Sequence, residues 1–276
     1  MDFKHTVKRA LYIEPFLSIP KHEKLQILGH FLQMKPLEVL SNLDLEIPEF
    51  ILEQYLDALK KLQSGMPVQY ITNTQGFYEL DFYVDENVLI PRPETEVLVQ
   101  TAIDLNLDST FQAIDIGTGS GCIAISLAKK YTQSHWIAVD ISVKALEVAR
   151  KNSILNQVKN IEFRESNLLE NISESNFDLI TANLPYIGTD SYEGVDINTK
   201  RYEPNLALFS GSDGLDLYRK LFKQINQKNI DFKYFLIEHA DNQEELLLEV
   251  IKEHFPNRKS QIIPDLNKIN RIILIF

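Results

Sequence analysis

Asp115-Ile116-Gly117-Thr118-Gly119-Ser120-Gly121 is the stretch of sequence that decides the fold of this chain. Its first two residues end a strand-like apolar segment, 111–116, and its last glycine begins a helical pattern, 121–131. Glycines at a strand-to-helix turn let the backbone approach a ligand closely. The stretch therefore predicts a ligand-binding turn at the start of an α/β domain.

The segments that follow alternate between strand and helix patterns. Further strands are expected at 135–139, 161–164, 177–182, 234–238, 261–263 and 271–276, and further helices at 142–156, 214–227 and 242–255. This alternation is typical of a doubly wound, mostly parallel sheet with helices on both faces. The fold class predicted for this region is therefore α/β and Rossmann-like.

The N-terminal part of the chain has a different pattern. Its apolar residues recur at helical spacing, and prolines at positions 20, 36 and 48 divide it into short helices. We expect a small all-α domain at 1–70, a β-hairpin linker at 71–92 and the α/β domain at 93–276. The helical domain either stabilises the chain or recognises a macromolecular substrate.

The hairpin is predicted from the alternating stretch Gly76–Val84. Tyr78, Leu80, Phe82 and Val84 are expected to share one face of this stretch, and Glu79 and Asp81 the other.

Composition excludes several classes of protein. The chain has 276 residues, of which 44% are hydrophobic and 24% charged, and no apolar run approaches the roughly 20 residues that a bilayer span needs. The N-terminus lacks a secretion signal, so a cytoplasmic location is expected. Cys122 is the one cysteine and no Cys/His cluster has metal-ligand spacing, so neither an internal disulfide nor a metal is expected. A net charge of −11 disfavours nucleic acid as a partner.

The glycine loop favours one cofactor over another. Its glycines are spaced G-x-G-x-G, which resembles S-adenosylmethionine enzymes more than the G-x-G-x-x-G of dinucleotide-binding proteins. Asp115 is expected to meet the ammonium group of the methionine part, and Asp140, after the second strand, both ribose hydroxyls. Asn167 and Leu168, after the third strand, are expected to bracket the adenine. The alternatives are a helix cap for Asp140 and a simple turn for Asn167.

Asn183-Leu184-Pro185-Tyr186 follows the fourth strand and suggests methyl transfer to a planar nitrogen. Such a nitrogen is a poor nucleophile, because its lone pair is delocalised. The Asn183 side-chain carbonyl and the backbone carbonyl of Leu184 or Pro185 can accept its N–H groups, while Tyr186 lies against its flat face. The alternative is a loop in which Pro185 only ends the strand and Tyr186 packs in the core.

Together these residues resemble the release factor glutamine N5-methyltransferase family. The resemblance covers nearly the whole chain. It rests on Gly65–Ile71, Val88–Glu96, the glycine loop, Asn183–Tyr186, Tyr202–Pro204 and Asp213–Asp216. It implies an N-terminal substrate-recognition domain, a hairpin linker and a seven-stranded S-adenosylmethionine-dependent methyltransferase domain whose last strand is antiparallel. The implied substrate is the glutamine of the Gly-Gly-Gln motif in peptide chain release factors. Apart from the resemblance, we expect the chain to work as a monomer in the cytoplasm.

The resemblance also implies roles for individual residues. Gly117, Thr118, Gly119, Ser120, Gly121, Asp140, Leu168 and Asn183 would hold S-adenosylmethionine, and Asn183, Leu184, Pro185 and Tyr186 would hold the acceptor glutamine. The chain departs from the family pattern at three places. Leu184 replaces the first proline of the commoner Asn-Pro-Pro-Tyr, Asn167 stands where aspartate is frequent, and Glu238-His239-Ala240 replaces Glu-Ile-Gly, although Gln243 still follows.

In the mechanism expected from these residues, Asn183, Pro185 and Tyr186 position the amide nitrogen in line with the methyl group, and S-adenosylhomocysteine is the second product. Three alternatives remain at this point. They are glutamine methylation of a ribosomal protein, N6-methylation of adenine in DNA or RNA, and a non-catalytic S-adenosylmethionine-binding protein.

Overall fold

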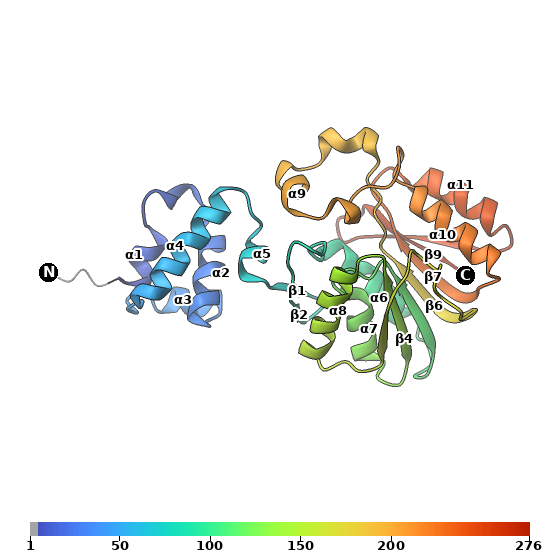
Figure 1. Ribbon diagram of the computed structural model, residues 1–276, viewed down its shortest axis with the longest axis horizontal. Helices are drawn as coiled ribbons and strands as arrows, with labels where there is room; N and C mark the ends of the chain where they lie inside the picture. Colours follow the sequence, from blue (N-terminus) through green and yellow to red (C-terminus); the bar gives the residue numbers. More distant parts are fainter. Residues whose placement is uncertain (1–4) are drawn as a thin grey trace. The chain divides into compact units, whose positions relative to one another are not determined.

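The computed structural model describes residues 5–276 and divides the chain into two compact units, one up to Thr74 and one over Gln75–Phe276. The first four residues of the predicted helical domain lie outside the described residues. Both units are traced in Figure 1. Among the described residues, no helix is long and apolar enough to cross a bilayer.

The first unit is a group of short α-helices whose starts are set by proline. Its helices are α1 (Val7–Leu11), α2 (Lys21–Leu32), α3 (Pro36–Ser41), α4 (Glu49–Gln63) and α5 (Val68–Thr72), with a 3₁₀ turn, η1, at Phe16–Ser18. Pro20, Pro48 and Pro67 each occupy the residue before a helix, where the lack of an N–H group costs nothing. Tyr55 and Leu28 are fully buried at the centre of its core. The helices and the proline breaks confirm the prediction from sequence.

A two-stranded hairpin opens the second unit. Its strands are β1 (Gln75–Phe77) and β2 (Leu80–Phe82), and the turn residues Tyr78 and Glu79 both have positive φ, 47° and 62°. Such a turn matches the twist of a tight hairpin. The hairpin is confirmed, but the predicted alternation across it is wrong, because Tyr78 lies in the turn and Phe77 is the residue buried beside Phe82. These two phenylalanines belong to a core of the second unit, so the hairpin is part of that unit.

The second unit is built on a seven-stranded sheet. The strands are β3 (Gln112–Ile116), β4 (His135–Asp140), β5 (Ile161–Glu165), β6 (Asn176–Ala182), β7 (Asp231–Glu238), β8 (Ser260–Pro264) and β9 (Asn270–Ile275). Their order is β5-β4-β3-β6-β7-β9-β8, and the first five are parallel. The last strand, β9, runs antiparallel to both neighbours. The predicted α/β fold is therefore confirmed, including the antiparallel last strand.

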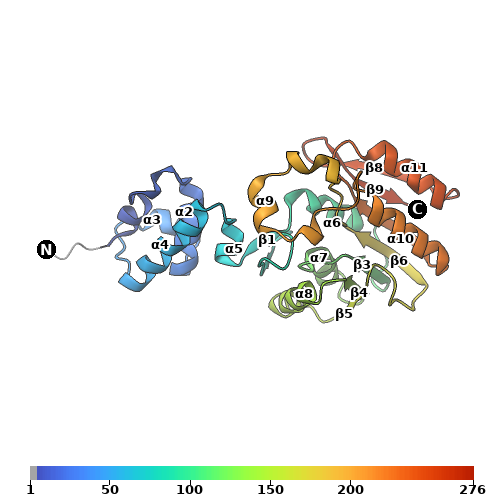
Figure 2. The ribbon, with the colours of Figure 1, turned by 45° about the horizontal axis from the view of Figure 1, so that its top comes forward.

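Helices cover both faces of this sheet (Figures 1 and 2). Helices α6 (Glu96–Asp104) and α7 (Cys122–Lys130) pack on one face together with the hairpin, and α10 (Asp216–Gln227) and α11 (Glu244–His254) pack on the other. Helix α8 (Val143–Leu155) contacts β4 and β5. Strands with helices on both faces are buried on both sides, which explains why β3 and β6 read as nearly continuous apolar runs. The predicted helices are confirmed to within two residues at each end.

Between β6 and α10 lies a segment without a periodic apolar pattern. It contains two 3₁₀ turns, η3 (Thr189–Gly194) and η4 (Asn205–Ala207), and a short helix, α9 (Ile197–Tyr202). A partly buried ion pair ties it to the segment before another 3₁₀ turn, η2 (Pro93–Thr95), because Arg92 Nη2 lies 2.5 Å from Glu203 Oε1. Glu203 Oε2 also accepts the Ile90 N–H. These contacts bring two distant parts of the chain together.

Candidate active site

One cavity of the second unit lies at the carboxyl ends of the parallel strands. Its walls follow β3, β4, β5 and β6, the edge where open α/β sheets bind their ligands. The lining includes the predicted residues Gly117, Thr118, Gly119, Ser120, Asp140, Asn167, Leu168, Asn183, Leu184 and Pro185. The lining does not include Gly121 or Tyr186, whose predicted roles remain predictions. Gly121 is the residue before α7 and has φ of 82°, so it shapes the turn.

The glycine loop is held open by backbone hydrogen bonds. The N–H groups of Gly117 and Thr118 both donate to the Val139 carbonyl at 2.9 Å. Gly117 and Gly119 have φ of 73° and 55°, in the left-handed region that glycine adopts freely. A Cβ at Gly119 would meet nothing within 4 Å, so the loop leaves open space beside it for a ligand.

Asp115 lies beneath the loop and does not line the cavity. It is 1% exposed, and its two oxygens accept the hydroxyls of Thr118 and Thr181 at 2.6 and 2.7 Å. Burial raises the pKa of the Asp115 carboxyl to about 6, although both hydroxyls favour the charged form. In this structure Asp115 clamps the loop to β6, whereas the sequence suggested direct contact with the cofactor.

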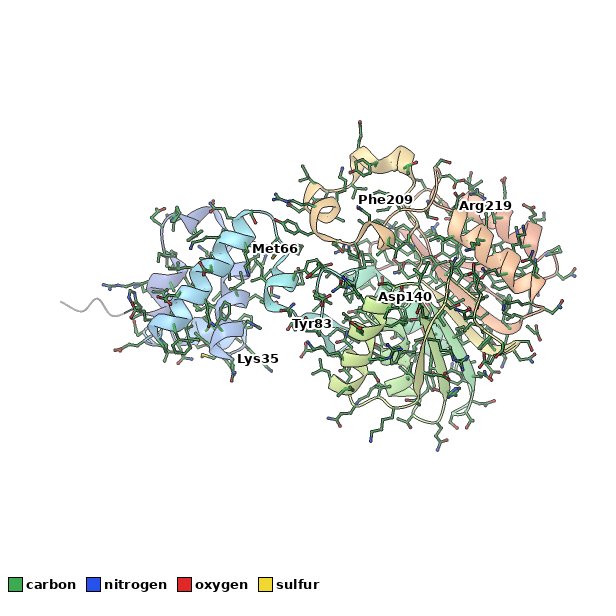
Figure 3. The ribbon with its side chains drawn as sticks, in the orientation of Figure 1. Lys35, Met66, Tyr83, Asp140, Phe209 and Arg219 are labelled. Carbon is green, nitrogen blue, oxygen red and sulfur yellow. The ribbon has the colours of Figure 1, made fainter. Side chains whose placement is uncertain are left out.

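Asp140 ends β4 and faces the cavity; its side chain is labelled in Figure 3. One carboxylate oxygen accepts the N–H of Gly119 and the other that of Ser142, both at 2.9 Å. Each oxygen has a second lone pair, so the carboxylate can still accept two hydroxyl groups. The alternative from sequence, a cap for the next helix, belongs instead to Ser142, whose hydroxyl accepts the Ala145 N–H.

Two apolar side chains flank the place expected for the adenine. Leu168 lines the cavity with φ of 56°, a left-handed conformation that is unusual for leucine and clusters at ligand sites. Ile141 lines the same cavity and is 47% exposed. Asn167 also lines it, but its side-chain amide donates to Glu170 at 2.9 Å. Asn167 therefore acts both in the turn and at the cavity wall.

The acceptor motif approaches the glycine loop very closely. A Cβ at Gly117 would lie 2.8 Å from Leu184 Cδ2, so a larger residue here would have to displace the Leu184 side chain. Leu184 is 3% exposed, and its N–H donates to the Tyr218 hydroxyl at 3.4 Å. Asn183 Nδ2 donates to Thr95 Oγ1 at 3.2 Å, and both residues line the cavity. Cofactor loop and acceptor motif thus share one cavity.

Tyr186 points away from the cavity, toward the interior. Its hydroxyl donates to Glu238 Oε1 at 3.3 Å, and burial raises its pKa. Its carbonyl accepts Gln243 Nε2 at 2.7 Å, and the same amide group donates to the Asp213 carbonyl. Gln243, which does not line the cavity, therefore holds the backbone of the acceptor motif in place.

Sequence reasoning did not identify Thr95, Ile141 or Glu238 as parts of the site. Thr95 belongs to the Pro-rich stretch Val88–Glu96, which carries part of the resemblance. Ile141 is the neighbour of Asp140, and Glu238 ends β7 at the same sheet edge as the other site residues. The rule that carboxyl ends of parallel strands meet could have found Glu238.

The cavity fits S-adenosylmethionine. The open glycine backbone offers room for the methionine part, the Asp140 carboxylate has free lone pairs for ribose hydroxyls, and Leu168 and Ile141 offer apolar walls for a flat base. Fold and site together define a Rossmann-like S-adenosylmethionine-dependent methyltransferase.

Comparisons with known proteins narrow this class. Residues 107–271 match the model of a methyltransferase domain, and residues 17–72 match that of the PrmC N-terminal domain. A release factor glutamine methyltransferase of Flavobacterium psychrophilum is 40% identical over 225 residues, which cover 77% of this chain and 78% of that protein. A release factor glutamine methyltransferase of Streptococcus pneumoniae is 36% identical over 219 residues, which cover 79% of this chain and 78% of that protein. The chain therefore belongs to the release factor glutamine methyltransferase family.

A solved structure supports the fold. The hMettl16 catalytic domain, crystallised with an RNA hairpin, superposes with a TM-score of 0.58, covering 93% of this chain and 91% of that one. The two are only 14% identical, so the likeness concerns the fold alone.

Proposed function

We propose that this chain transfers a methyl group from S-adenosylmethionine to the side-chain amide nitrogen of the glutamine in the Gly-Gly-Gln motif of peptide chain release factors. The observation that carries the proposal is that Asn183, Leu184 and Pro185 line the same cavity as the glycine loop and Asp140, in a chain of this family. A flat amide bound at the acceptor motif would thus meet a methyl group held beside the loop.

The acceptor motif would hold the amide by its N–H groups. Because Asn183 Nδ2 is bound to Thr95, its Oδ1 is available to accept one N–H, and the Pro185 carbonyl to accept the other. These bonds oppose amide resonance and strengthen as positive charge develops on the nitrogen. Tyr186 and Gln243 would fix the backbone of the motif from the interior side.

Bound S-adenosylmethionine would supply a methyl carbon activated by its sulfonium, so no strong base is needed to start the reaction. Transfer of this methyl group to the amide nitrogen would leave S-adenosylhomocysteine, and the nitrogen would give up one of its two protons to water. Holding the nitrogen in line and roughly 3 Å from the carbon can lower the barrier by several kcal/mol.

The proposal includes a protein substrate, no nucleic acid, and a single copy of the chain working in the cytoplasm. The net charge of −11 supports a protein substrate over bare nucleic acid. The cytoplasm is where release factors meet the ribosome.

The test is mass spectrometry of a purified release factor after incubation with the chain and S-adenosylmethionine. A gain of one methyl group on the Gly-Gly-Gln glutamine is the expected result. A ribosomal protein and an adenine-containing RNA are offered in parallel. The proposal would be contradicted if only one of these were methylated and the release factor were not.

A further inference from the structure

A cluster of polar side chains, formed by Asn183, Thr95, Tyr186 and the buried carboxylate of Glu238, lies beneath the acceptor motif. Asn183 Nδ2 donates to Thr95 Oγ1, and the Thr95 hydroxyl lies against the Glu238 carboxylate and stabilises its charged form. The Tyr186 hydroxyl donates to Glu238 Oε1 from the other side. Glu238 is 1% exposed, and among the described residues its Oε2 has no hydrogen bond of standard geometry.

The buried Glu238 carboxylate determines which groups in this cluster donate hydrogen bonds and which accept them. An ionised carboxylate only accepts hydrogen bonds, and the Tyr186 hydroxyl donates to Glu238. The Thr95 hydroxyl donates to no other acceptor among the described residues, so its proton can turn toward the same carboxylate, whose Oε2 has no partner there. With its proton used in this way, Thr95 Oγ1 can only accept from Asn183, and the Asn183 amide must turn its nitrogen toward it. The carbonyl oxygen Oδ1 is then left for the cavity.

We propose that Glu238, acting through Thr95, is a positioning residue that fixes the Asn183 amide with its carbonyl oxygen toward the acceptor nitrogen. The inference rests on the proposed function, because only an acceptor that offers N–H groups needs this orientation. If the amide were reversed, its NH₂ group would face the N–H groups of the substrate, and the two sets of donors would repel each other. Glu238 touches neither substrate nor cofactor in this role.

Protonation of Glu238 would remove the constraint. Burial raises the pKa of its carboxyl to about 7, opposed by Thr95 and Tyr186. A protonated Glu238 can donate to Thr95, and Thr95 can then donate to Asn183 Oδ1, which reverses the amide. The other ionisable groups that act on this carboxylate are Arg271 on β9, which lowers its pKa, Glu94 before α6, which raises it, and Tyr218 and Cys122, whose own pKa values it raises.

The test compares two variants that change different members of this cluster, Glu238 and Thr95. Glu238→Gln removes the charge at nearly constant shape, and Thr95→Val removes the hydroxyl at constant shape. Each is expected to lower kcat for release factor methylation at least tenfold at saturating substrates, while S-adenosylhomocysteine binds within threefold of its wild-type Kd by calorimetry. The kcat of the double variant should fall no further than that of the less active single variant, since both changes act on the same set of contacts.

Three controls separate positioning from folding. Thr95→Ser restores the hydroxyl and should recover most of the rate lost in Thr95→Val. Thr101→Val removes a similarly buried hydroxyl on α6, which donates to the Val97 carbonyl outside the site, and should leave kcat unchanged. Wild-type kcat should rise with pH through about 7, and this rise should be absent from Glu238→Gln.

The outcomes are distinguishable. If wild-type chain transfers no methyl group to the release factor, the proposed function fails and the positioning role with it. If wild-type chain is active but both single variants stay within threefold of it, only the positioning role fails. Losses that multiply in the double variant, or a rise with pH that persists in Glu238→Gln, would likewise overturn the role of Glu238.

Discussion

Two buried carboxylates support the two ends of the cavity, and they are bonded very differently. Asp115, under the glycine loop, accepts hydroxyls on both oxygens at 2.6 and 2.7 Å. Glu238, under the acceptor motif, accepts Tyr186 at 3.3 Å, and its Oε2 has no hydrogen bond of standard geometry among residues 5–276. Burial raises the pKa of both, to about 6 for Asp115 and about 7 for Glu238. The carboxylate with the fuller set of partners keeps the lower pKa.

The hydrogen bonds around the glycine loop and around the acceptor motif differ in the same way. The Asp140 carboxylate accepts the N–H groups of Gly119 and Ser142 at 2.9 Å, whereas the Asn183 amide, the Leu184 N–H and the Tyr186 hydroxyl make bonds of 3.2 to 3.4 Å. Hydrogen bonds in a site without substrate are often long and tighten when the substrate binds. The cofactor end is thus built in advance, while the acceptor end keeps bonding capacity for its substrate.

The largest effect is expected at the preformed end. Asp140→Ala removes the carboxylate that would accept two ribose hydroxyls and leaves the N–H groups of Gly119 and Ser142 without it. Two charge-assisted bonds correspond to about 3 kcal/mol, so Kd for S-adenosylmethionine should rise roughly a hundredfold. Calorimetry measures this Kd directly. The Kd of Asp140→Asn should lie between that of the wild type and that of Asp140→Ala. A Kd within threefold of the wild type would remove Asp140 from the cofactor site.

At the acceptor end, Asn183→Ala should lower kcat tenfold or more, about 1.4 kcal/mol or more in the transition state, when cofactor is saturating. The physical reason is the loss of an acceptor that strengthens as charge develops on nitrogen. Single-turnover rates measure the effect. Asn176→Ala, at the exposed opposite end of β6, is the matched control and should not change the rate. An unchanged rate in Asn183→Ala would exclude its catalytic role.

A smaller effect on stability is expected from Thr118→Val, which leaves one oxygen of Asp115 without its hydroxyl. The cost should be about 1 kcal/mol of the free energy of unfolding. Because this hydroxyl favours the ionised form of Asp115, the loss should be larger at pH 7 than at pH 5, below its pKa of about 6. Urea unfolding at both pH values measures the difference. A loss that is larger at pH 5 would contradict this account of the clamp.

The smallest effect is expected from Leu184→Pro, which creates the commoner form of the motif. Proline removes an N–H group whose bond to Tyr218 is long, at 3.4 Å, so the cost should be below about 1 kcal/mol. We expect kcat within threefold of the wild type. A larger change in rate would show that Leu184 itself selects the acceptor.

Most of the fold could be predicted from the sequence, because buried strands and amphipathic helices leave periodic patterns. The N-terminal helices were predicted well, since proline marks their starts. The turn at Tyr78 and Glu79 was not, because neither residue is a usual choice for positive φ. The segment from η3 to η4 was also missed, as it is held by contacts distant in sequence, such as Arg92 with Glu203, rather than by a periodic core.

Within the site, the residues that follow strands were found because their position alone places them at one edge. Residues that act from beneath were harder to identify. Asp115 was expected in the cavity, but the hydroxyls of Thr118 and Thr181 keep it below the loop. Thr181 lies 66 positions from Asp115, and a pairing across neighbouring strands has no local signature. The link from Asn183 through Thr95 to Glu238 is hidden from sequence for the same reason.

The cavity draws its walls from segments that stretch from Asn87 to Leu217. No short fragment of the chain can form it, so ligand affinity belongs to the folded second unit as a whole. A molecule that binds there will protect this unit from unfolding by mass action, by about 2.7 kcal/mol at a concentration one hundred times Kd. Inside a cell, the supply of methyl donor would thereby help set how long the enzyme survives.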